Sequence, residues 1–243
     1  MIRVIKKVAS YLIRLNKKFM MALELPNSFV QFLIRPLKIS NYIKNNKVRK
    51  LQLGSGTNRY DGWFNTDLYP RGGNAYLDVT SPLPFKDNTF DYIYSEHMIE
   101  HISFQDAEQL LRESYRILRR GGKLRIATPD LSHYVSLFGE NKSPQQNEYI
   151  DWMHSNWINK AGIKYKNESF VLNLAMHSWG HLFIFDFNTL NSVLSDIGFG
   201  EIKQFECQKS DDENLVNLEN HGEVIGNIKM NHMETLVVQG TKL

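Results

Sequence analysis

The stretch from Lys50 to Leu68 constrains the fold of this chain more than any other part of it. A short apolar segment leads into the tripeptide Gly54-Ser55-Gly56, and a second strand-like segment follows that ends on Asp67. Glycine lets a backbone turn sharply and lets a ligand approach without a Cβ in the way. An acidic residue at the end of the next strand suits the two hydroxyls of a ribose. The pattern therefore predicts a nucleoside-type cofactor bound at the carboxyl edge of a parallel sheet.

The rest of the body alternates short apolar segments with helical patterns. Strands are expected over residues 49–53, 64–68, 75–79, 90–94, 123–128, 202–207 and 234–239, and helices over residues 104–118 and 188–197. The first helix is expected to end at a glycine cap, Gly121-Gly122, and the second at Gly198. The connection between the first two strands is poor helix. This order predicts an α/β fold: a Rossmann-like, doubly wound, mostly parallel seven-stranded sheet that binds ligands at the carboxyl ends of its strands.

Length and composition fit one large α/β domain with an appendage. The chain has 243 residues, of which 42% are hydrophobic and 23% charged, so it can bury a substantial core. Its single cysteine, Cys207, excludes an internal disulfide framework and a cysteine-based zinc cluster. A lone cysteine also fits a reducing, cytoplasmic setting.

The first fifty residues are strongly basic, whereas the remainder of the chain is acidic. The first fifty contain twelve Lys or Arg residues and one acid, Glu24, and the remainder has 17 basic and 25 acidic residues. An acidic body argues against nucleic acid as a partner. We divide the chain into a basic helical leader, residues 1–47, and a body, residues 48–243. Within the body, residues 131–181 form an aromatic-rich insertion.

The leader has the pattern of an amphipathic helix. Apolar residues recur at three- and four-residue steps between basic ones, at Ile5, Val8, Leu12, Leu15 and Phe19. Pro26 and Pro36 then delimit a second short helix and a linker, and no run is long and apolar enough to span a bilayer. Two interpretations stay open. The leader attaches peripherally to an anionic inner-membrane surface or a membrane-bound partner, or it packs over the sheet with its lysines in water.

Five motifs follow one another through the body. They are Leu51–Gly56, Asn65–Asp67, Leu77–Val79, Asp87–Ile93 and Glu113–Leu124. In this order and spacing they resemble the class I S-adenosylmethionine-dependent methyltransferases, in particular the methyltransferase type 11 group, over residues 48–130 and more weakly over residues 181–240. The motif Gly62–Asp67 resembles that of a subgroup of these methyltransferases, the enzymes of bacterial capsule and surface-polysaccharide biosynthesis.

The resemblance implies S-adenosyl-L-methionine as cofactor and a set of residues that bind it. That set is Leu53, Gly54, Ser55, Gly56, Asp67, Leu68, Asp78, Val79 and Glu96. The glycine turn would line the methionine moiety and the ribose, Asp67 would hold the ribose hydroxyls, and Asp78 would meet the adenine. Gln52 departs from the family, which usually has an acidic residue at this position, so that one contact is in doubt.

A nicotinamide dinucleotide is the alternative cofactor, since an acid after the second strand suits its ribose as well. The loop from Gly54 to Arg59 lacks the third glycine that lets a helix pack closely under a pyrophosphate. This difference favours S-adenosylmethionine over the nicotinamide cofactor.

Two pairs of histidines, His97 with His101 and His177 with His181, are each spaced four residues apart. The first pair is expected on a helix that begins right after the fourth strand, with both rings on one face. Three roles are open: a general base for an acceptor hydroxyl, ligands of a divalent metal, or packing, which we favour for His101. The catalytic candidates are His97, His181 and Glu96, and the metal candidates are His97, His101, His177 and His181.

Aromatic residues are concentrated in the insertion, at Tyr134, Tyr149, Trp152, Trp157 and Trp179. The insertion is expected on the side where the methyl acceptor binds, and these residues form either a platform for that acceptor or the core of a helical lid.

Together these features predict an S-adenosylmethionine-dependent O-methyltransferase. Its acceptor would be a small glycan-related or nucleotide-activated molecule of bacterial surface-polysaccharide biosynthesis. Histidine would serve as the base or as a metal ligand. The alternatives are a non-catalytic cofactor-binding scaffold at a membrane assembly and an NAD-dependent sugar oxidoreductase.

Overall fold

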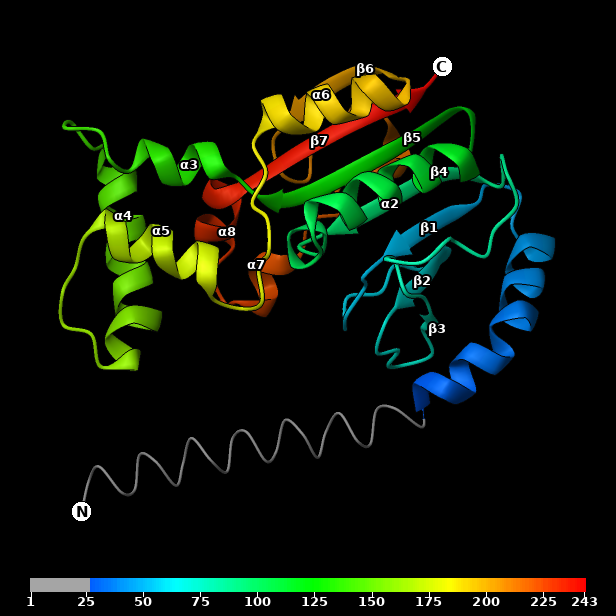
Figure 1. Cartoon of the computed structure of the whole chain (residues 1–243), viewed down its shortest axis with the longest axis horizontal. Helices are drawn as coiled ribbons and strands as arrows, with labels where there is room; N and C mark the ends of the chain where they lie inside the picture. The colour runs from blue at the N-terminus through cyan, green and yellow to red at the C-terminus, as the bar shows by residue number, and fades with distance from the viewer. Residues whose placement is uncertain (1–26) are drawn as a thin grey trace.

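The structure is a computed structural model that describes residues 27–243. The amphipathic helix predicted between Ile5 and Phe19 lies outside the described residues. Within them, one mixed sheet carries helices on its face and a group of short helices beyond one of its edges (Figure 1).

The sheet has seven strands in the order β3-β2-β1-β4-β5-β7-β6. The strands are β1 (Lys50–Leu53), β2 (Trp63–Asp67), β3 (Ala75–Tyr76), β4 (Phe90–Glu96), β5 (Leu118–Pro129), β6 (Phe199–Phe205) and β7 (Thr235–Lys242). The first five run parallel, and β7 is antiparallel to both of its neighbours. The predicted doubly wound, mostly parallel sheet of seven strands is thereby confirmed.

Helices α2 (Phe104–Ile117) and α6 (Phe187–Ile197) cover one face of the sheet. Their buried apolar side chains join those of the strands in one core that includes Leu110, Leu190 and Ile93. The opposite face is covered by the segment before β7, where Leu215 and Leu218 pack on aromatic residues of β2 and β4. As predicted, α6 ends at Gly198, which adopts a left-handed conformation.

The insertion forms a helical group beyond the carboxyl ends of β4 and β5 (Figure 1). It contains α3 (Leu131–Ser136), α4 (Pro144–Met153), a π-helical turn (His154–Ile158), a 3₁₀ turn (Asn159–Ala161) and α5 (Glu168–His177). Two short helices that precede β7, α7 (His221–Val224) and α8 (Ile228–Glu234), close the space between this group and the sheet. The insertion has its own apolar core, centred on Tyr149, Met153 and Val171.

The expected glycine cap of α2 is absent, because a neighbouring loop takes its place. The helix ends at Ile117, and Gly121 and Gly122 lie inside β5. The N–H groups of Asn88 and Thr89 donate to the last helical carbonyls, those of Arg116 and Ile117, at 3.1 and 2.7 Å. The helix end is satisfied from outside, so no left-handed cap is needed.

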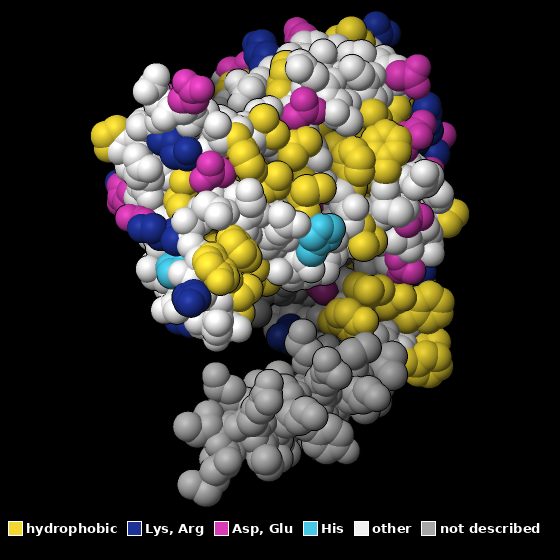
Figure 2. Space-filling model, turned by 60° about the vertical axis from the view of Figure 1, so that its left-hand side comes forward, with side chains coloured by type: hydrophobic (Ala, Val, Ile, Leu, Met, Phe, Trp, Pro, Cys, Tyr) yellow, Lys and Arg dark blue, Asp and Glu magenta, His cyan; other side chains and the backbone are white. Residues whose placement is uncertain are grey.

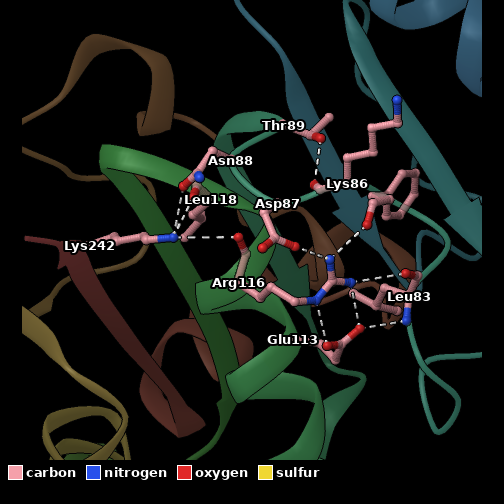
Figure 3. Close-up of polar contacts among 10 residues, drawn as sticks. Leu83, Lys86, Asp87, Asn88, Thr89, Glu113, Arg116, Leu118 and Lys242 are labelled. Carbon is pink, nitrogen blue, oxygen red and sulfur yellow. Dashed lines mark hydrogen bonds and ion pairs between the residues drawn. The ribbon is translucent and has the colours of Figure 1, made fainter.

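Arg116 fixes the same loop from the helix side (Figure 3). Its guanidinium makes five hydrogen bonds: two to Glu113, one to Asp87, and one each to the carbonyls of Leu83 and Phe85. Lys242, at the end of β7, donates to Asn88 and to the carbonyls of Arg116 and Leu118. Two of the sequence motifs, Asp87–Ile93 and Glu113–Leu124, thus contribute the residues that join α2 to the amino ends of β4 and β5.

Two further predicted boundaries differ. Residues 27–45 form one helix that continues through Pro36, so no linker separates a short helix from the body. The third strand is limited to two residues, since Asp78 accepts hydrogen bonds from Thr80 and Ser81 in a turn. No helix among residues 27–243 is both long and apolar enough to cross a membrane.

Candidate active site

The turn after β1 is tight and requires glycine. Gly54 and Gly56 have φ angles of 64° and 52°, which side chains with a Cβ rarely adopt. A Cβ on Gly54 would lie 2.3 Å from the Cγ of Met98. As expected, no helix follows; residues 54–62 lead directly into β2 by turns. The helix N-terminus that holds a pyrophosphate in dinucleotide-binding folds is therefore missing at this position.

Asp67 lies at the end of β2, beside this turn. One carboxylate oxygen accepts the N–H of Gly56 at 2.8 Å and the other accepts the N–H of Tyr69 at 2.8 Å. Each carboxylate oxygen can accept more than one hydrogen bond, so Asp67 both orders the turn and keeps acceptor capacity for a ligand. Asp78 also orders a turn: its Oδ1 accepts the N–H and the hydroxyl of Thr80, and its Oδ2 accepts the hydroxyl of Ser81.

A cavity of about 150 Å³ lies over the glycine turn. Four of the predicted cofactor residues line it, Gly54, Ser55, Gly56 and Glu96, together with Gln52, Thr57, Asn58, His97, His221 and Val224. Leu53 is buried in the core and Leu68 is exposed. Neither of them, nor Asp67, Asp78 or Val79, lines this cavity, so the structure collects only part of the predicted set around it.

A second cavity, of about 260 Å³, lies between the carboxyl ends of the strands and the insertion. Its lining is aromatic, histidine and carboxylate: His97, Glu100, His101, Pro129, Tyr134, Trp152, Met153, Trp157, Trp179, His181, His221, Ile225 and Glu234. His97 and His221 also line the first cavity. Their rings are stacked 4.0 Å apart, so this pair forms the wall that the two cavities share.

His97 is not on a helix, contrary to the sequence prediction. Strand β4 continues to Glu96, His97 has a φ of 45°, and only Ile99–His101 form a 3₁₀ turn. The N–H of His97 still pairs with the carbonyl of Ala127 at 2.9 Å, which extends the ladder to β5. The left-handed residue then reverses the chain, so His97 and His101 do not share a helical face.

Both ring nitrogens of His97 face protein groups. Nε2 lies 3.2 Å from the hydroxyl of Thr235 and 3.1 Å from the amide of Asn231. Nδ1 lies 3.4 Å from Oε1 of Glu100, an ion-pair distance outside hydrogen-bond geometry. His97 therefore has no ring nitrogen left over for an acceptor and serves as a fixed part of the wall.

The pKa of His97 is raised and that of Glu100 is lowered. Burial by itself lowers the pKa of His97, but the carboxylates of Glu100, Glu234 and Glu96 outweigh it and raise that pKa. Burial raises the pKa of Glu100, but His97 and His101 outweigh it and lower that pKa. Both shifts favour an imidazolium next to a carboxylate.

His181 differs from His97 because one nitrogen remains open to the cavity. Its Nδ1 lies 2.6 Å from the carbonyl of Ala175, which fixes the proton on Nδ1 and leaves a lone pair on Nε2. Nε2 has no hydrogen-bond partner among residues 27–243. Burial lowers the pKa of His181, so the neutral ring is favoured. The His181 ring lies 4.9 Å from that of His101, whereas His177 is exposed at the end of α5 and lines neither cavity.

Three titratable lining residues were not among the predicted site residues: Glu100, His221 and Glu234. Glu96 accepts the N–H of His221 at 2.7 Å, and burial raises the pKa of Glu96. Burial and the charge of His97 lower the pKa of His221 to about 4. Burial raises the pKa of Glu234, which accepts the hydroxyls of Tyr134 and Tyr149. Glu100 lies four residues after Glu96 in the sequence, but His221 and Glu234 lie far from every motif.

The aromatic residues of the insertion divide between the two predicted roles. Trp152, Trp157, Trp179 and Tyr134 line the larger cavity, and the rings of Trp157 and Trp179 meet edge to face at 5.3 Å. Tyr149 is fully buried in the core of the insertion. The insertion is thus a helical cover whose inner side is the cavity wall.

Part of the chain is similar to known proteins. A family model described as "Methyltransferase domain" matches residues 71–126, which run from β3 into β5. An uncharacterized protein of Methanocaldococcus jannaschii is 27% identical over 117 residues, 43% of this chain and 56% of that protein. The chain thus spans about half the length of the curated relative it matches.

Solved structures of similar shape include two described as S-adenosylmethionine-dependent methyltransferases. One, from Archaeoglobus fulgidus, is 15% identical, with 88% of this chain and 93% of that chain covered and a TM-score of 0.49. The other, a possible histamine N-methyltransferase from Thermotoga maritima, is 18% identical, with 90% and 95% covered and a TM-score of 0.47. The strand order and the antiparallel β7 agree with the Rossmann-like seven-stranded sheet that the sequence predicts.

Proposed function

We propose that this protein is an S-adenosylmethionine-dependent methyltransferase that methylates a hydroxyl of a small acceptor. The observation that carries the proposal is the shared wall: the cavity over the glycine turn and the aromatic cavity meet at His97 and His221. Because these two residues line both cavities, a methyl donor in the first cavity and an acceptor in the second would meet beside them, with the reacting atoms about 3–3.5 Å apart, as a direct displacement requires.

The reaction converts the hydroxyl and the sulfonium cofactor into a methyl ether, S-adenosylhomocysteine and one proton. The cofactor supplies the leaving group, so the protein has to align the two molecules, exclude water and take the proton. His181 suits the last task because its open Nε2 faces the larger cavity. Glu96 accepts the N–H of His221 and would position this residue where the two cavities meet.

On the donor side we assign the methionine and ribose to the turn Gly54-Ser55-Gly56 and the ribose hydroxyls to Asp67. The free acceptor capacity of Asp67 supports this assignment. Asp78, Val79, Leu53 and Leu68 stay candidates for the adenine end, which projects beyond the described cavity in this arrangement. The absence of a helix after the glycine turn, within the described residues, speaks against a nicotinamide dinucleotide.

For the acceptor we propose a small glycan-related or nucleotide-activated molecule of bacterial surface-polysaccharide biosynthesis. Tryptophan faces stack on sugar rings and bases, and Trp152, Trp157 and Trp179 offer such faces beside polar groups. The pathway itself follows only from the resemblance of the motif Gly62–Asp67.

The donor site can be tested by calorimetric titration with S-adenosylhomocysteine. Gly54→Val should abolish binding, since its side chain would collide with Met98 and requires a strained φ. Gly62→Ala is the matched control, because Gly62 has a φ of 77° but open space around its Cβ position. Equal affinity in the two variants would remove the assignment of the glycine turn to the cofactor.

Asp67→Ala should weaken binding of S-adenosylhomocysteine more than tenfold, because hydrogen bonds to the ribose worth about 1.5–3 kcal/mol are lost.

Two other functions have distinct outcomes in the same assays. Stabilisation by NAD and not by S-adenosylhomocysteine would indicate an oxidoreductase. Tight binding of S-adenosylhomocysteine without methyl transfer to any sugar or nucleotide-sugar acceptor would favour a scaffold subunit.

For the leader we propose contact with an anionic membrane surface. The helix over residues 27–45 exposes Phe29, Val30, Leu33 and Leu37 at helical spacing, and Figure 2 shows hydrophobic side chains gathered at the lower right of that view. Residues 27–50 contain six basic and no acidic residues, which complements anionic lipid. Sedimentation with phosphatidylglycerol vesicles should fall for Leu33→Glu/Leu37→Glu. Unchanged sedimentation of that variant, or none of the wild type, would refute the contact.

A further inference from the structure

We propose that Glu100, His101 and His181 bind a divalent transition-metal ion at the wall of the aromatic cavity. One ligand atom of each residue lies within 4.8 Å of those of the other two, and Glu100 Oε1 lies 3.8 Å from His101 Nε2. Metal bonds of about 2.0–2.2 Å place neighbouring ligand atoms about 3.0–3.5 Å apart. A small inward movement of these side chains therefore completes the site.

Glu100 supplies the first argument. Its side chain is fully buried, and its Oε1 has no hydrogen-bond partner in the described part of the chain. The other oxygen, Oε2, accepts the hydroxyl of Thr128 at 2.9 Å, which orients the carboxylate. Oε1 lies 3.4 Å from Nδ1 of His97 and 3.8 Å from Nε2 of His101 but accepts no hydrogen bond within the described residues, so it keeps lone pairs that a cation on the cavity side would use.

His181 supplies the second argument. Metal-bound histidines generally donate their other N–H to a carbonyl or carboxylate, which fixes the tautomer and the ring. The carbonyl of Ala175 has this relation to Nδ1 of His181. The side chain of His101 is 37% exposed, and its ring packs edge-on against that of His181.

The ligand set determines the kind of ion. Two imidazoles and one carboxylate favour ions such as Zn²⁺, Mn²⁺, Fe²⁺ or Co²⁺ over Mg²⁺ and Ca²⁺, which prefer oxygen ligands. Three protein ligands leave positions open on the cavity side, toward Trp157 and Trp179. The role of those positions rests on the proposed function: two oxygens of the acceptor, such as a sugar diol, would fill them.

A bound cation changes the part that His181 plays. Its Nε2 is then a ligand and no longer a base, and the cation acidifies the coordinated hydroxyl, which releases its proton to water. His97 and His177 lie outside the three-residue group, so the site differs from the set of four histidines expected from the sequence.

The test is titration of the full-length, chelator-treated protein with Zn²⁺ by calorimetry and with Co²⁺ by visible absorption. Wild type should bind one ion per chain. His101→Gln and His181→Gln should each weaken binding at least about 100-fold, because each removes a ligand. His177→Gln is the matched control, since that exposed histidine lies four residues before His181 without joining the group, and it should bind as wild type does.

Absence of binding by the wild type, or binding that survives in both ligand variants, would overturn the site. Circular dichroism and thermal unfolding of each variant show whether it is folded. Failure of this inference is distinguishable from failure of the proposed function. A protein that binds S-adenosylhomocysteine and turns over fully in chelator refutes only the metal. A protein that binds Zn²⁺ through these residues but not S-adenosylhomocysteine refutes only the methyltransferase.

Discussion

Two polar clusters at opposite edges of the same sheet use their hydrogen-bonding groups differently. At the amino ends of β4 and β5, all five N–H groups of Arg116 are paired, and both oxygens of Glu113 are occupied (Figure 3). At the carboxyl ends, three buried atoms make no hydrogen bond within the described residues: Glu100 Oε1, Asn231 Oδ1 and Trp157 Nε1. The saturated cluster holds a loop to a helix, and the unsaturated one keeps bonding capacity for a ligand.

The largest expected effect of breaking this contrast concerns His181. His181→Ala should lower kcat/KM at least about 100-fold, as loss of a base or a metal ligand does. Its affinity for S-adenosylhomocysteine and its thermal midpoint should stay close to the wild-type values. His177→Ala is the control and should keep full turnover. Normal turnover in His181→Ala would make this residue part of the packing and leave Glu100 unexplained.

The next effect concerns the acid sensitivity of the insertion beside the unsaturated cluster. Burial lowers the pKa of His133 from 6.5 to about 4, and its ring packs on Tyr134 and Tyr149. The unfolded chain therefore takes up a proton below pH 6.5 that the native protein does not, so stability present above pH 6.5 is lost as the pH falls toward 4. The loss is on the order of 3 kcal/mol, at 1.36 kcal/mol per pKa unit.

His133→Phe keeps a ring of similar shape without the proton site. Urea unfolding of both proteins between pH 7 and pH 4 measures the difference. The variant should lose less stability than the wild type over this range. Parallel curves would show that His133 is accessible to protons in the native protein.

The smallest effect belongs to the saturated cluster. Arg116→Met should cost about 1–2 kcal/mol of stability, since charge-assisted hydrogen bonds to a half-buried loop are lost but solvent screens part of the gain. The kcat/KM of the folded variant should not change. Arg112 provides the control, because it is exposed on the same helix as Arg116 and is paired with Glu108 of α2 and Asp196 of α6. Arg112→Met should have no measurable effect on stability. A catalytic defect in Arg116→Met would contradict the division between the two edges.

Much of the fold was predictable because strands and helices leave local patterns. The seven strands, the two long helices, the helix-free turn after β1 and the cap at Gly198 follow from periodicity, glycine and composition. The end of α2 was not predictable, because Asn88 and Thr89 satisfy its carbonyls through a tertiary contact. The reversal at His97 depends equally on the pairing with Ala127 in the neighbouring strand.

Only the part of the site next to the parallel strands was predictable from the sequence. Gly54, Gly56, Glu96 and His97 come from segments next to parallel strands, whose ends must meet at one edge. His221 and Glu234 reach that edge because β7 runs antiparallel, and Thr235 lies 138 residues from the ring that it contacts. No spacing in the sequence signals such a contact. His177 shows the converse, since a regular spacing to His181 did not place it in the site.

The antiparallel course of β7 also links the position of the His97 ring to the completion of the sheet. Thr235 opens this strand and Asn231 precedes it, and both hold the ring of His97. β7 inserts between β5 and β6, so the shared wall gains its final supports only when the last strand is in place. A molecule in which β7 is not paired therefore lacks the two groups that hold the ring of His97 between the two cavities.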